Sequence, residues 1–115
     1  MESILTSIKK MLGIAEEYTH FDADLIIHIN SVFAILTQIG VGPSEGFSIE
    51  DDTDVWTDFI QDNKRLESVK SYTYMKVKLL FDPPLSSAVM ESYNRTISEL
   101  EWRISISGEE EENIE

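Results

Sequence analysis

Residues 77–106 read VKLLFDPPLSSAVMESYNRTISELEWRISI, where one helical pattern ends at two adjacent prolines and another begins. Neither proline has a backbone N–H to donate, and Pro83 pushes Asp82 out of the helical region, so the first helix must end there. Ser86 and Ser87 then offer side-chain oxygens that cap a following helix. The sequence therefore predicts a long helical hairpin in the C-terminal half of the chain.

The helix after the prolines carries apolar residues at alternating spacings of three and four. No glycine or proline interrupts them, which predicts one helix of about 18 residues, roughly 27 Å long. Its apolar positions are Met90, Tyr93, Ile97, Leu100 and Ile104. The helix before the prolines, about 64–81, is apolar over much of its circumference, so neighbours should cover it on more than one side.

Three shorter helices are predicted upstream. The first spans residues 3–12, and the second begins at a capping Asp22 and ends at Gly40. A third, over 54–61, is capped by Asp52 or Thr53. Residues 41–49 contain glycine, proline and serine, which predicts a mobile loop with a short extended piece or a small hairpin.

These elements predict an all-α fold: a single domain of four to five helices over residues 1–107, with its core between the second, fourth and fifth helices. Residues 108–115, GEEEENIE, carry too much like charge to fold alone, which predicts a disordered acidic tail. The chain of 115 residues has no cysteine, which excludes disulfides and thiolate metal sites. No apolar run approaches the roughly 20 residues that span a bilayer, so we expect no membrane contact.

The charge of the chain is strongly negative and unevenly distributed. A net charge of −13 argues against binding to nucleic acid phosphates or anionic lipid. Seven carboxylates and no base lie in 45–62, whereas 63–81 has five bases and one carboxylate. Two oppositely charged faces let copies stack head to tail, and the candidate contacts are Glu50, Asp51, Asp52 and Asp54 against Lys64, Arg65, Lys76 and Lys78. The alternative is that both blocks are ordinary solvated surface.

No catalytic or metal-binding set emerges from the residues. An EF-hand loop starting at Asp52 would place Trp56 and Thr57 where a ligand and a glycine are needed. His20 and His28 lack the spacing of a zinc pair, and no serine elbow or glycine-rich phosphate loop is present. The tyrosines and tryptophans suit packing better than stacking on bases. We therefore expect no enzyme activity, no cofactor and no metal.

With these elements in view, the chain resembles the small helical head-tail connector proteins, or head-completion adaptors, of long-tailed double-stranded DNA phages. The resemblance covers roughly residues 3–106. It rests on LGI at 12–14, DADLIIHINSVFAILTQIGVG at 22–42, the Trp56 segment, and KLLFDPP at 78–84 followed by LEWRI at 100–104.

The resemblance implies a structural protein that acts in a phage or prophage particle. Such proteins form a ring, commonly of about a dozen subunits, that docks beneath the portal and extends the DNA channel toward a tail-side adaptor. It implies a place at the head-tail interface of the virion, and in the host cytoplasm before assembly. The alternatives from the residues alone are an acidic inhibitor or DNA mimic that binds a basic partner, and a small regulatory helical module.

Overall fold

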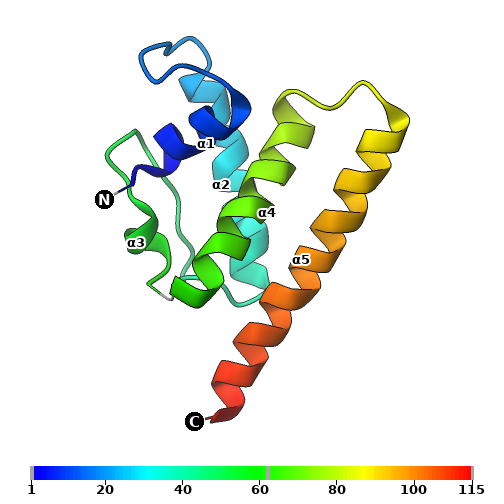
Figure 1. Ribbon diagram of the computed structural model, residues 1–115. Helices are drawn as coiled ribbons and strands as arrows, with labels where there is room; N and C mark the ends of the chain where they lie inside the picture. Colours follow the sequence, from blue (N-terminus) through cyan, green and yellow to red (C-terminus); the bar gives the residue numbers. More distant parts are fainter. Residues whose placement is uncertain (1, 62, 115) are drawn as a thin grey trace.

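The computed structural model describes the backbone of residues 2–61 and 63–114, and the side chains of 2–61 and 64–106. Five helices lie in the described part of the chain, with overall extents of 45 × 36 × 20 Å (Figure 1). They are α1 (Ile4–Leu12), α2 (Asp22–Gln38), α3 (Trp56–Phe59), α4 (Asn63–Phe81) and α5 (Ser87–Ile114). The predicted all-α fold with a long C-terminal hairpin is confirmed.

Helix α4 is the centre of the packing. It contacts α2 and α5 most extensively, and α1 as well. In Figure 1, α5 is the outer helix on one side of α4, and α1, α2 and α3 lie on the other side. The expectation that α4 is covered on more than one side is therefore confirmed.

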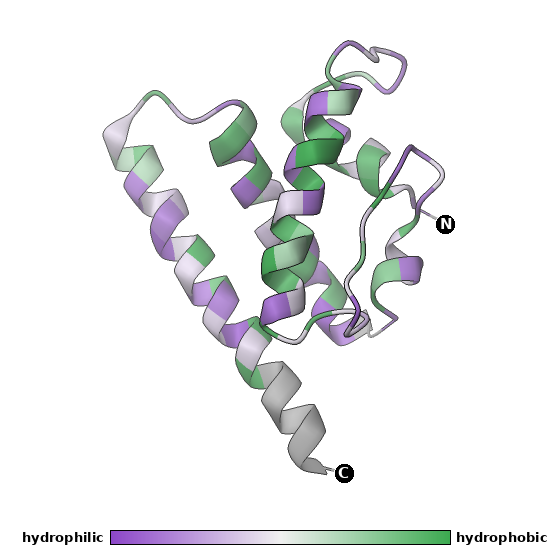
Figure 2. Cartoon of the chain, turned by 180° about the vertical axis from the view of Figure 1, so that it is seen from behind, coloured by the Kyte–Doolittle hydropathy of each residue, from purple (hydrophilic) through white to green (hydrophobic). Residues whose placement is uncertain are grey.

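The core includes α2, α4 and α5, as expected, but it takes in further elements as well. Among the described side chains of α5, only Ile97 and Ile104 are buried, at 5% and 2% exposure. Hydrophilic residues occur along much of the coloured part of this helix (Figure 2). Helix α1 and the segment before α4 contribute more than the sequence suggested, because they pair with each other: Ser3 and Val55 form an antiparallel bridge. The buried hydrophobic residues from these two regions are Ile4, Leu5, Ile8, Val41, Ile49, Trp56, Phe59 and Ile60.

The ends of α1 are set by local capping. Ser3 Oγ accepts from the backbone N–H of Thr6 at 3.2 Å. Gly13 ends the helix with φ of 81°, and the N–H of Ile14 reaches back to the carbonyl of Lys9. The helix therefore ends at Leu12, as predicted for the span 3–12, at a glycine in the left-handed region.

Two predicted caps are wrong. Helix α2 is preceded by Phe21, while Asp22 lies in the first turn and forms an ion pair with Lys9 at 2.9 Å. Helix α3 is only four residues long and starts after Val55, so neither Asp52 nor Thr53 caps it. In both places a long-range contact fixes the backbone: the ion pair to α1 in one, the bridge to Ser3 in the other.

The hairpin turns where the prolines predicted. Helix α4 ends at Phe81, and Ser86 caps α5 by accepting from Val89 N–H at 3.4 Å through Oγ. The backbone of α5 is helical to Ile114, farther than the roughly 18 residues expected. Side chains after Ile106 lie outside those described, so the predicted disorder of 108–115 stays a prediction.

The loop after α2 is anchored at both ends. Val41 and Ile49 are buried, and the Asn30 side chain bonds both the N–H and the carbonyl of Ile49, at 2.7 and 3.0 Å. A Cβ on Gly42 would stand 2.5 Å from the Phe59 ring, so this close approach requires glycine. No hairpin forms over residues 41–49. The mobility of the middle of this loop stays a prediction.

Candidate interaction surfaces

The acidic candidates form an ordered turn before α3. Asp54 Oδ2 accepts from the backbone N–H of Glu50 at 2.8 Å and of Asp51 at 3.3 Å. Asp51 Oδ1 accepts from Thr53 Oγ1 and from the Thr53 N–H, which lowers the pKa of Asp51. Glu50 and Asp52 are exposed. The turn thus uses two carboxylates internally and presents the others to solvent.

The basic candidates do not share one face of α4. Arg65 is buried at 9% exposure and donates to the carbonyl of Ile104 in α5 at 3.3 Å. Lys78 pairs with Asp82 at 2.8 Å, and Lys64 is exposed near the start of α4. Lys76 lies on the side of α4 that meets α2. The block is continuous in sequence, but the helical turn distributes it around α4.

A groove lined mainly by apolar side chains lies between α2 and α4. It has a volume of about 320 Å³ and is lined by Ser31, Val32, Ile35, Lys76, Leu79 and Leu80. Leu80 on its rim is 53% exposed, and Ile27 on α2 is 63% exposed. The Lys76 ammonium makes no ion pair or hydrogen bond with any described residue.

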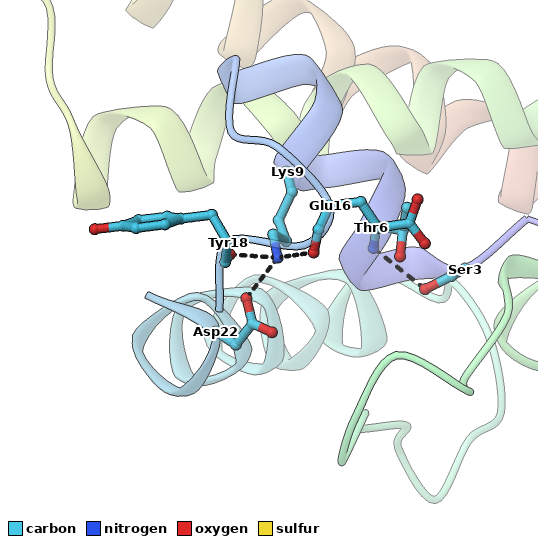
Figure 3. A network of polar contacts seen from close by, with 6 residues as sticks. All are labelled: Ser3, Thr6, Lys9, Glu16, Tyr18 and Asp22. Carbon is cyan, nitrogen blue, oxygen red and sulfur yellow. Dashed lines mark hydrogen bonds and ion pairs between the residues drawn. The ribbon is translucent and has the colours of Figure 1, made fainter. Parts of the chain in front are cut away.

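A buried lysine holds the loop between α1 and α2 (Figure 3). Lys9 is 2% exposed, and its ammonium donates to the carbonyls of Glu16 and Tyr18 at 2.8 and 2.7 Å. The Asp22 carboxylate lies 2.9 Å away and balances its charge. The clasp joins α1, the loop and α2, so it fixes the exposed Glu16, Glu17 and Tyr18 at one end of the molecule.

Comparison with known families decides what kind of protein carries these surfaces. The family model described as phage connector protein matches residues 4–111. This chain belongs to the phage connector family. No curated protein matches the chain, and no solved structure does.

The match confirms the resemblance drawn from the sequence and supports a connector role in a phage particle. A connector family is a structural one, which favours a protein without enzyme activity. None of the helices in the described part of this connector combines the length and the hydropathy of a membrane span. Nor do three histidine or acidic side chains converge there as a metal site would require.

Most aromatic residues of the connector pack against one another or across its helices. The Tyr72 hydroxyl donates to Glu101 at 2.8 Å across α4 and α5, and Tyr74 meets Tyr93 at 3.4 Å. Burial, and then the bond to Glu101, raises the pKa of Tyr72. Trp56 is buried. These groups hold the hairpin and the core, so they form no platform for stacked bases.

Sequence reasoning missed three features of the connector: the Lys9 clasp, the α2–α4 groove, and the exposure of Trp102. The spacing of Lys9 in α1, one residue after the buried Ile8, gave no sign that its ammonium would be enclosed. The sequence offered one hint: Lys9 is followed by the acidic pair Glu16 and Glu17 and by Asp22 at the start of the next helix. Trp102 stands in the LEWRI motif and is 64% exposed.

Proposed function

We propose that this chain is the subunit of a ring that docks on the portal of a phage and extends the DNA channel toward the tail. The observation that carries the proposal is the match to the phage connector family over residues 4–111. The partners would be further copies of the chain, the portal protein and a tail-side adaptor. Its place would be the head-tail interface of the virion, and the host cytoplasm before assembly.

The charge of the chain suits a DNA channel. A net charge of −13 repels phosphate, so a wall built from such subunits lets DNA slide, whereas a basic wall would hold it. Sequence-specific binding to DNA is not expected of this surface.

The proposal includes contact between the acidic block of one copy and the basic block of the next, but the fold reduces the number of residues that can take part. Arg65 is buried, and Asp51 and Asp54 take part in bonds within their own turn. Exposed Asp52 and Glu50 on one copy would face Lys64 and Lys78 on the next. Such rim pairs act mainly on association rate and register.

The connector proposal is tested by mass and by capture of the portal. Purified chain at high concentration should show species larger than a dimer in analytical ultracentrifugation, and tagged chain should retain the portal protein of the same phage. A chain that stays monomeric and ignores the portal contradicts the proposal. If it instead bound a basic DNA-binding protein at one-to-one stoichiometry, the inhibitor or DNA-mimic alternative would replace it.

A further inference from the structure

Trp102 is a large aromatic side chain that is mostly exposed to solvent. It is 64% exposed, while Ile97 and Ile104 on the same helix are almost fully buried. Trp102 follows Ile97 by five residues, which places it about 140° round the helix from that buried position. It therefore lies on the side of α5 away from the buried positions that pack on the core. Exposed tryptophan is costly in solvent and is enriched at the energetic centres of protein interfaces.

The other tryptophan of the chain shows how this fold buries an indole. Trp56 is 2% exposed, and its Nε1–H donates to Ser7 Oγ at 2.7 Å. Ser7 in turn donates to the carbonyl of Ile4 on its own helix. The Lys70 ammonium lies 5.8 Å from the centre of the indole, and the Phe33 ring packs against its edge. The site consists of apolar walls, a helix serine as acceptor and a lysine over the ring.

The α2–α4 groove contains the same three components and no indole. Its walls are Val32, Ile35, Leu79 and Leu80. Ser31 donates its hydroxyl to the carbonyl of Ile27 at 3.0 Å, which leaves its oxygen free to accept an N–H, as Ser7 does. Lys76 supplies an ammonium that has no partner among the described residues, and a cation of this kind is attracted to the face of an indole.

We propose that Trp102 of one copy inserts into the α2–α4 groove of the next copy, with its Nε1–H directed to Ser31 and Lys76 over its face. The proposal rests on the connector function proposed above and names one contact that would build the ring. Glu99, one turn before Trp102, pairs with Arg103 at 2.6 Å, so the approaching face carries an ion pair beside the indole.

Trp102 and the α2–α4 groove lie on different faces of the subunit, which favours head-to-tail assembly. Trp102 lies on the side of α5 away from its buried positions, and the groove lies beyond α4, where α2 meets it. One copy can therefore donate its tryptophan and receive another at the same time. Such a heterologous contact forms a ring if the rotation closes and a filament if it does not.

Fluorescence tests the contact directly, because the chain has two tryptophans and one is buried. Acrylamide is the suitable quencher, since it is neutral and is not repelled by the net charge. Dilute wild-type chain should be quenched readily at Trp102. In the assembled fraction, quenching should fall severalfold and the emission should shift to the blue.

Two variants test the two sides of the contact, Trp102 and the groove, one at a time. Trp102→Ala keeps the groove, and Ser31→Phe fills the groove from its rim while keeping Trp102. Each should weaken self-association about 30-fold or more, the effect of losing an interface hot spot. Mixed in equal amounts they should form heterodimers and nothing larger. Leu85→Ala, which trims another exposed apolar side chain, should assemble as wild type does, and circular dichroism checks that each variant is folded.

Three outcomes would overturn the proposal. If Trp102 stays accessible to acrylamide in assembled wild type, the contact is wrong while the connector function stands. Assembly that stops at a dimer shows a closed two-fold contact in place of the head-to-tail one. A wild-type chain that neither assembles nor binds the portal removes the contact together with the connector function.

Discussion

Lys9 is the side chain on which the α1–α2 connection depends. Its ammonium is enclosed, bonded to two carbonyls and paired with Asp22, and breaking such a pair leaves a buried group uncompensated. We expect Lys9→Met to lower the free energy of unfolding by about 3–5 kcal/mol in a urea titration. The neighbouring Lys10 is exposed, so Lys10→Met is the matched control and should change it by less than about 0.5 kcal/mol. Equal stability of the two variants would show that the clasp contributes nothing.

At the scale of the helix, docking of α5 on α4 depends on few residues. Ile104 is 2% exposed and Ile97 is 5% exposed, whereas Leu100 is only partly buried against the core. We expect Ile104→Ala to cost about 2–5 kcal/mol, because it leaves a cavity. Leu100→Ala, which would reach that range only if fully buried, should cost about 1–2 kcal/mol. Denaturant titrations of the two variants check the order, and a larger loss for Leu100 would contradict the packing described.

The same hairpin should weaken in alkali. The hydrogen bond with Tyr93, and then burial, raises the pKa of Tyr74 to about 12 from its ordinary value of 10.0. A raised pKa in the folded state gives stability that is complete below pH 10 and lost as the pH rises toward 12. We expect urea midpoints to fall over this interval and to fall less steeply in Tyr74→Phe. Half-exposed Tyr18→Phe is the control, and identical slopes in the two variants would remove the tyrosine pair as the cause.

For the whole molecule, the charge contact between copies is separable from the tryptophan contact. Lys76 lies in the groove, so the charge test leaves it intact and reverses Lys78 instead. Lys78→Glu should slow assembly modestly, and Asp52→Lys in the same chain should partly restore the rate. Both effects should vanish at high salt, since exposed charges are screened within about 8–10 Å at physiological ionic strength. Stopped-flow light scattering over a salt series measures this, and absence of rescue would leave the two blocks as solvated surface.

The acidic C-terminus is predicted to contribute nothing to the stability of the subunit. Its carboxylates repel one another, so truncation after Ser107 should leave the melting temperature unchanged within about 2 °C. Calorimetry of the full and truncated chains makes the comparison. A drop of several degrees would show that residues 108–115 dock on the domain.

Much of this architecture follows from local chemistry. Pro83 and Pro84 end one helix whatever surrounds them, Gly13 and Ser3 define another, and the apolar stripe of α5 identifies its inner side. These features depend on backbone geometry and on residues one turn apart, so the sequence determines them directly. The family resemblance rested on the same packing motifs and is confirmed.

Only the tertiary structure decided which polar and aromatic groups are enclosed. Trp56 and Trp102 look alike in sequence, yet one lies in the core because Ser7 and Lys70 meet it from other helices, and the other stays in solvent. Lys9 is buried because a loop and α2 fold over it. The basic residues of α4 lie on different sides of the helix, because α4 packs between α2 and α5. Each outcome depends on residues distant along the chain, and such contacts exist only once the helices have packed.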